Sequence, residues 1–233
     1  MRVGLFDSGI GGLTVLKSLI KRYPNNEYIY FGDTLNLPYG SKNKEELKKL
    51  AKFNVDFLLR FNVDIIIVAC GTVSSNCLDY LKNNYDTPII DIISPTIKYL
   101  NNSNYNNIGI IATEATISSH IFKNNIKKNV YEIATPKLVP LIESNNLVNI
   151  KNILDDYLDK YKDRIDILVL GCTHYPLLID YFDIDVLDMA SLIEIDNNGN
   201  GSVKVFFSKV DDILVSNVKR ILGREIEIME IEH

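Results

Sequence analysis

Apolar residues along the chain gather in short continuous runs, which are separated by longer stretches with helical periodicity. Residues 64–72 begin with an acid, continue as an apolar run and end around Cys70, and residues 166–174 repeat this order around Cys172. A short run without polar alternation is typical of a strand that is buried on both faces of a parallel sheet. Each cysteine is therefore predicted at the carboxyl end of such a strand, where open α/β sheets bind their ligands. We call these two strands the first and second cysteine strands.

A second repeated pattern precedes these two strands. Residues 3–8 and residues 108–113 share an apolar run that ends in small or polar residues. The two repeated pairs occur in the same order and at nearly the same separation, which indicates two related halves. Two such halves would offer one thiol each to a small molecule held between them.

The remaining patterns alternate between strand and helix. Residues 44–62 have helical periodicity, with Leu47, Leu50, Ala51, Val55 and Leu58 on one face. In chain order, the expected elements are strand 1–6, helix 13–21, strand 27–32, loop 33–43, helix 44–62, the first cysteine strand, a helix to about 85, strand 88–92, a strand ending at 112, a helix from about 116, strand 130–133, helical segments to 160, the second cysteine strand, and a final strand, helix and strand over 203–231.

This alternation predicts the α/β class with mainly parallel sheets in two lobes. The strongest linker signal is Ser94-Pro95 together with the polar run at 101–107. We expect the final unit to return to the first lobe. The expected lobes are a first one that carries Cys70, residues 1–94 plus 206–233, and a second one that carries Cys172, residues 95–205.

Composition and charge exclude several classes of protein. A chain of 233 residues that is 46% hydrophobic and 24% charged is ordinary for a globular enzyme. No apolar stretch approaches the roughly 20 residues of a membrane helix. Residues 1–4 run directly into a predicted strand, so no signal peptide is expected and the predicted location is the cytoplasm. A net charge of −5 gives no electrostatic footprint for nucleic acid.

The cysteines are three, and they have none of the spacings of a zinc site or a disulfide framework, so free thiols and no metal are expected. Cys77 lies within a predicted helix and is interpreted as a buried apolar side chain. Cys70 and Cys172 lie instead at strand-to-helix turns, where helix N–H groups lower the pKa of a thiol. Their repetition favours a functional interpretation.

A glycine-rich turn, residues 7–12, follows the first strand. It lacks the G-x-G-x-x-G spacing of a dinucleotide site, because Thr14 occupies a required glycine position, and it contains no phosphate-binding lysine motif. Its backbone N–H groups at a helix N-terminus suit a carboxylate. Asp7 and Ser8 are then expected to face the ligand crevice.

His174, two residues after Cys172, has three interpretations: a structural histidine, the base of a hydrolytic Cys-His pair, or a proton partner of Cys172. A hydrolase needs one such cysteine, and its histidine normally comes from elsewhere in the chain. The duplicated thiol favours the proton partner.

Several segments together resemble the glutamate racemase family, which belongs to the aspartate/glutamate racemases. The match is collinear, spans nearly the whole chain, and is most specific at its first and last segments. The segments are residues 7–14, residues 37–40, the stretch around Cys70, residues 113–119, residues 136–143, and Gly171-Cys172-Thr173-His174-Tyr175-Pro176.

The resemblance implies a cofactor-independent homodimer of two pseudo-symmetric, flavodoxin-like lobes that interconverts L- and D-glutamate for peptidoglycan synthesis, cell wall biogenesis and cell shape. It implies that Cys70 takes the α-proton of D-glutamate and Cys172 that of L-glutamate, with Asp7 and His174 assisting the thiols. Glu143 is implied near the second thiol. The residues implied to bind the substrate are Ser8, Pro38, Tyr39, Gly40, Gly71, Thr72, Thr113, Thr116, Glu143 and Thr173.

The chain departs from the family pattern at three places. Gly71 stands where the family usually has Asn, Thr135 where Cys is common, and Met189-Ala190 where Ser and Gly are expected. The first departure concerns the substrate site. Either a hydrogen bond to a charged substrate group is missing, or glycine is needed there for its backbone conformation or to admit another substrate.

Other functions stay open at this point. A related two-cysteine racemase for another amino acid, such as aspartate, has the same pattern. A degenerate homologue that binds an amino acid without turnover is disfavoured by the intact thiol pair, and a flavodoxin-like cofactor binder is disfavoured because no phosphate loop is present.

Overall fold

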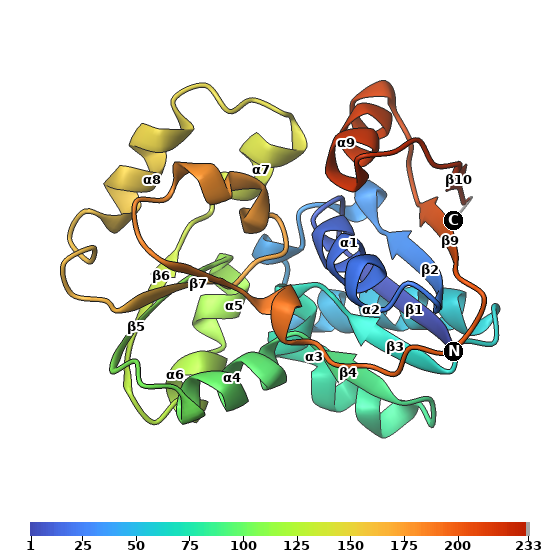
Figure 1. Cartoon of the computed structure of the whole chain (residues 1–233), viewed down its shortest axis with the longest axis horizontal. Coiled ribbons are helices and arrows are strands. Elements are labelled where there is room, and N and C mark those ends of the chain that lie inside the picture. The colour runs from blue at the N-terminus through green and yellow to red at the C-terminus, as the bar shows by residue number, and fades with distance from the viewer. Residues whose placement is uncertain (232–233) are drawn as a thin grey trace.

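The chain forms two parallel sheets, one in each lobe, in a computed structural model that describes residues 1–231 (Figure 1). The strands of the six-stranded sheet are β1 (Arg2–Asp7), β2 (Glu27–Gly32), β3 (Ile65–Val68), β4 (Ile89–Asp91), β9 (Ser202–Phe207) and β10 (Ile228–Glu230). Those of the four-stranded sheet are β5 (Asn107–Ala112), β6 (Asn129–Ala134), β7 (Ile167–Leu170) and β8 (Val186–Asp188). The α/β class with mainly parallel sheets is confirmed.

Helices connect the strands. The α-helices are α1 (Gly12–Arg22), α2 (Lys44–Leu59), α3 (Gly71–Asn84), α4 (Ile93–Asn102), α5 (Glu114–Ser118), α6 (Ile121–Asn125), α7 (Leu138–Glu143), α8 (Ile150–Leu158) and α9 (Asp212–Leu222). The 3-10 helices are η1 (Thr34–Asn36), η2 (Tyr39–Ser41), η3 (Tyr175–Tyr181) and η4 (Met189–Leu192). Among the described residues, no helix combines the length and apolar character that crossing a membrane requires.

The two sheets repeat one strand order. The order β2-β1-β3-β4 in the first sheet matches β6-β5-β7-β8 in the second. The acid that opens each cysteine strand has the same role in both: Asp64 accepts from the N–H of Arg2, and Asp166 accepts from those of Asn106 and Asn107. These hydrogen bonds fix the register of the central pair of strands, and they lower the pKa of Asp166. The pseudo-symmetry expected from the repeats is therefore present.

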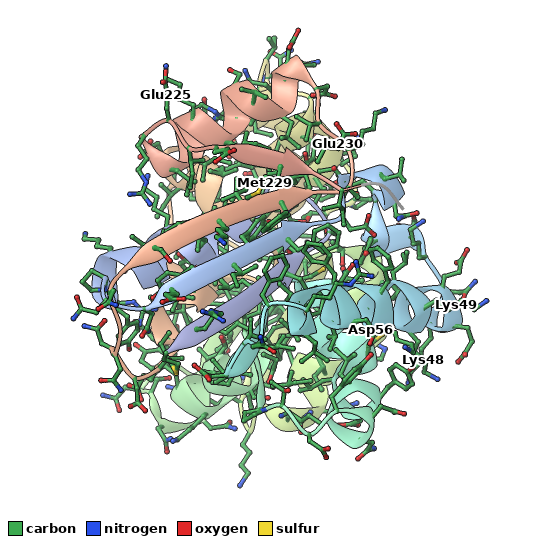
Figure 2. The ribbon with its side chains drawn as sticks, turned by 90° about the vertical axis from the view of Figure 1, so that its right-hand side faces the viewer. Lys48, Lys49, Asp56, Glu225, Met229 and Glu230 are labelled. Carbon is green, nitrogen blue, oxygen red and sulfur yellow. The ribbon has the colours of Figure 1, made fainter. Side chains whose placement is uncertain are left out.

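The final unit joins the first sheet, because β9 pairs with β2 and β10 pairs with β9. Figure 2 looks onto the outer side of this lobe, where α2 runs alongside the strands and Met229 marks β10. The capping box of Asn43 and Glu46 starts α2. Its apolar stripe is buried against the sheet, while Lys49 points to solvent.

The chain crosses between the lobes through α4 and again through the segment after η4 (Figure 1). The linker expected here from the sequence contains a helix that was not predicted. The Asp91 carboxylate accepts from the N–H groups of Ile93 and Ser94 at the start of α4, and Pro95 is tolerated because it lies in the first turn. One apolar cluster contains core residues of both sheets, among them Val3 and Ile108, so the lobes share part of their core.

Candidate active site

Cys70 and Cys172 lie two residues beyond β3 and β7, at the carboxyl ends of equivalent strands, and both line one cavity between the lobes. They are 4% and 7% exposed. Nearly all of the substrate-binding residues expected from the sequence gather around this cavity. Its lining comprises Ser8, Leu37, Pro38, Tyr39, Gly40, Ser41, Cys70, Gly71, Thr72, Thr113, Glu114, Thr135, Pro136, Val139, Pro140, Cys172, Thr173 and His174.

Three of the expected residues lie behind the lining. Asp7 is fully buried, and its carboxylate accepts from the Gly9 N–H and the Thr173 hydroxyl. Thr116 contacts Thr113 (Oγ1···Oγ1 3.0 Å), and Glu143 contacts His174. These three support lining residues, whereas Asp7 was expected to face the crevice itself.

Cys172 belongs to a chain of three polar side chains. Its Sγ lies 3.6 Å from Nδ1 of His174, and Nε2 of His174 lies 2.6 Å from Oε1 of Glu143. Burial alone would lower the pKa of His174, but the hydrogen bonds to Cys172 and Glu143 outweigh burial and hold that pKa well above its usual range. A protonated imidazole is the kind of partner that stabilises negative charge on a neighbouring sulfur.

Cys70 has a different environment. Its thiol donates a hydrogen bond to the Ser8 hydroxyl (Sγ···Oγ 3.8 Å). Burial, and secondarily the nearby Asp7, raise the pKa of Cys70, so the lowering expected from the helix N-terminus does not prevail. Burial also raises the pKa of Asp7, and His174 opposes that rise. The raised pKa favours the protonated thiol at Cys70, whereas Cys172 has an imidazole as its partner.

The glycine-rich turn binds a carboxylate of the protein itself. The N–H of Ile10 donates to Oε1 of Glu143 (3.1 Å), the same oxygen that contacts His174. A Cβ on Gly9 would lie 2.3 Å from this oxygen, and one on Gly11 would lie 2.3 Å from Nδ1 of His174. Glycine is therefore required at both positions, because the second lobe approaches the turn this closely.

The N-termini of α3 and α5 meet at the cavity and carry a row of hydroxyl groups. Thr72 lies 2.9 Å from Thr113, and Thr113 also accepts from the N–H of Thr116 at the start of α5. Free N–H groups in the first turn of α3 and threonine hydroxyls together suit a carboxylate. The lining contains no lysine or arginine among the described residues, so a bound carboxylate depends on these neutral donors.

Tyr39 contributes to the cavity wall, but its hydroxyl points away. It donates to Asp33 (2.6 Å) and accepts from the Asn54 amide (3.2 Å), both of them fully buried. This network fixes η2 against the core. Sequence reasoning did not find Asp33 or Asn54, because only the fold brings them to Tyr39.

Sequence reasoning also missed part of the lining: Leu37, Ser41, Glu114, Thr135, Pro136, Val139 and Pro140. Five of the seven lie inside segments that carried the resemblance, and Ser41 and Thr135 directly adjoin such segments, so the segments themselves were the available signal. Cys77, as expected, is buried in α3 among apolar side chains. Within residues 1–231, His, Cys, Asp and Glu side chains form no group of three or more that could hold a metal ion.

Comparison with known proteins gives the family. The model of the Asp/Glu/Hydantoin racemase family matches residues 14–192, which include both cavity cysteines. The glutamate racemase of Aquifex aeolicus is 38% identical over 244 residues, covering 97% of this chain and 96% of that protein. The glutamate racemase of Fusobacterium nucleatum is 39% identical over 258 residues, covering 99% and 97%.

A solved structure agrees with these relatives. Glutamate racemase from Francisella tularensis, crystallised in complex with D-glutamate, superposes with a TM-score of 0.86 at 30% identity, over 100% of this chain and 97% of that one. The chain, with its two parallel sheets and its paired cysteines at equivalent strand ends, thus belongs to the Asp/Glu/Hydantoin racemase family and is an amino-acid racemase.

Proposed function

We propose that this racemase interconverts L- and D-glutamate by proton transfer between two thiols. The observation that carries the proposal is the placement of Cys70 and Cys172 at equivalent strand ends on one cavity, each with its own polar partner. Racemisation removes the α-proton from one face of a carbon and supplies a proton to the other, so two acid/base groups on opposite sides suffice. The glutamate substrate is supported by the close relatives, which are glutamate racemases.

In the direction from L-glutamate, the Cys172 thiolate accepts the α-proton and becomes a thiol. The electron pair of the broken C–H bond stays on the substrate as a carbanion conjugated with the carboxylate. The Cys70 thiol then donates its proton to the opposite face and becomes a thiolate. From D-glutamate the same steps run in reverse, with Cys70 as the base. In this direction His174, which contacts Sγ of Cys172, is the group placed to balance charge on that sulfur.

The hydroxyl groups and the start of α3 supply the electrostatic part of the reaction. The α-carboxylate gains negative charge as the carbanion forms, and fixed N–H and O–H donors stabilise charge that develops in the transition state. Thr72 and Thr113 already contact each other in a partly buried setting, so they need little reorganisation. We assign the substrate carboxylates to this row of donors and to Thr173.

A chain with this activity supplies D-glutamate for peptidoglycan, and hence for cell wall biogenesis and cell shape. We also propose that it acts in the cytoplasm and that it is a homodimer. Sedimentation of the purified protein tests the oligomeric state directly. The proposal requires no cofactor, because the reaction exchanges only protons.

The experiment that tests the proposed function offers single enantiomers to the purified protein. L-glutamate and D-glutamate should each lose optical activity until the mixture is racemic, whereas L- and D-aspartate should change far more slowly. Faster conversion of aspartate would instead support the related racemase for that substrate. No conversion of any amino acid, with binding retained, would support the degenerate homologue.

Gly71 carries a prediction about substrate fit. Its φ is not positive, but a Cβ there would lie 2.6 Å from the backbone oxygen of Gly171, closer than real Cβ atoms approach. The close approach of the lobes therefore requires glycine. Gly71→Asn should widen the cavity and lower kcat/KM on glutamate by roughly five- to a hundredfold, as overpacking of about 1–3 kcal/mol implies.

Gly71→Ala separates the two interpretations of this position. It adds the same Cβ without an amide, so the steric account predicts a loss of similar size in both variants. If Gly71→Asn gives higher glutamate turnover than the wild-type protein, the missing-amide interpretation holds and the steric account is wrong. Assays on aspartate in parallel show whether the glycine sets substrate choice.

A further inference from the structure

Asn217 is a polar residue at an apolar position of α9. Leu214, Val218 and Ile221 form the buried stripe of this helix, and Asn217 lies within that stripe at 2% exposure. A buried amide is costly unless its hydrogen bonds are satisfied. A polar side chain in an otherwise apolar stripe therefore needs hydrogen-bond partners within the fold.

Both ends of the Asn217 amide are satisfied. Its Nδ2 donates to the backbone oxygen of Glu143 (3.3 Å), and its Oδ1 accepts from Arg220 (2.9 Å). Glu143 is the last residue of α7, where helix carbonyls have no partner within the helix. In Figure 1, α7 and α9 face each other from opposite lobes. The contact therefore ties the first lobe to the end of the helix that presents Glu143.

The Glu143 carboxylate is also held from both lobes. Its Oε1 accepts from the N–H of Ile10 in the first lobe and contacts His174 in the second. A shift of α7 away from α9 would move this oxygen relative to the imidazole, which it meets at 2.6 Å. The interaction between Glu143 and His174 thus depends on contacts that exist only when the lobes are together.

We propose that Asn217 is a positioning residue for proton transfer: by holding the Glu143 backbone it keeps the carboxylate on His174 and so keeps the imidazole in place beside Cys172. This inference rests on the proposed roles of Cys172 and His174. It adds a residue on the opposite lobe that positions the partner of the second thiol. Other titratable groups that face this cluster are Asp7 on β1, Tyr30 on β2, Cys70 before α3, Tyr175 on η3 and Arg220 on α9.

The test is the pH dependence of Cys172 alkylation by iodoacetamide in the full-length protein, with each cysteine peptide quantified by mass spectrometry. Asn217→Leu and Asn217→Ala both remove the amide without adding charge, and alanine favours the helix. Loss of one neutral hydrogen bond changes an equilibrium or rate constant by roughly two- to tenfold. We expect kcat/KM to fall by that factor, and the midpoint of Cys172 alkylation to move up by as much as about one pH unit.

Asn76→Leu is the matched control. Asn76 also donates its amide across the lobes, to the backbone oxygen of Ala115 (3.2 Å), but on the side of α5 rather than α7. The inference predicts that this variant keeps the wild-type alkylation midpoint. Unchanged midpoints in folded Asn217 variants, checked by thermal unfolding, would overturn the inference while the two-thiol proposal stands. A wild-type Cys172 that titrates like an ordinary thiol would also overturn the inference, whereas loss of the two-thiol proposal would show in the activity of the cysteine variants.

Discussion

Cys70→Ala and Cys172→Ala should each abolish racemisation of glutamate in both directions. With either thiol replaced, one face of the substrate carbon has no group that accepts or donates a proton. Because each thiol is the base in one direction and the acid in the other, neither direction survives. Positioned acid/base groups contribute roughly 10²- to 10⁴-fold each, so the residual rate should be below about a hundredth of the wild-type rate. Loss of optical activity from each pure enantiomer measures it.

The third cysteine is the control for this prediction. Cys77 is 1% exposed, packs in the apolar cluster under α2 and α3, and has its pKa raised by burial to about 11. It does not line the cavity. Cys77→Ala should therefore keep most of the activity and lose only some stability through the small void it leaves. Near-normal turnover by a Cys70 or Cys172 variant would refute the two-base assignment.

His174→Gln should lower kcat/KM by roughly a hundredfold or more. The change removes the imidazole between Cys172 and Glu143, and with it the positive charge that stabilises a thiolate. Since enantiomers have equal free energies, kcat/KM must fall by the same factor for L- and D-glutamate. Initial rates with both enantiomers check this equality and the size of the loss.

His120→Gln makes the same chemical change at a residue that does not line the cavity. His120 pairs with Glu132 (Nδ1···Oε2 2.8 Å), and its side chain is 55% exposed. This variant should stay within about twofold of the wild-type rate, as surface substitutions usually do. A His174→Gln enzyme with more than a tenth of normal activity would show that Cys172 does not depend on the imidazole.

The strands of this fold could be predicted because their signals are local. β2 has the bounds that were expected, and the two cysteine strands lie within the two apolar runs. The short strand β8, three residues long, was missed because its pairing with β7 decides it. The helix α4 was missed because Asp91, outside the polar run, caps its start.

The site was predictable as a set of residues, and less so as a set of contacts. Strand-end positions placed Cys70 and Cys172 each at the carboxyl edge of its own sheet, and the repeat of the two halves indicated that both thiols face one ligand. The hydrogen bond from Ile10 to Glu143 joins residues far apart in the chain, and the Tyr39 hydroxyl turns to Asp33 instead of the cavity. The first contact follows from how the lobes pack and the second from how η2 packs on its own lobe, and no local pattern encodes either.

The most direct test of two separate bases is racemisation in heavy water. Each enantiomer of glutamate is incubated with the enzyme in D₂O, and both enantiomers are separated early and analysed for deuterium by mass spectrometry. Two monoprotic thiols on opposite faces predict that newly formed product carries one α-deuterium while unreacted substrate carries none. Product that retains its original hydrogen would mean that one base serves both faces, and the two-thiol account would be wrong.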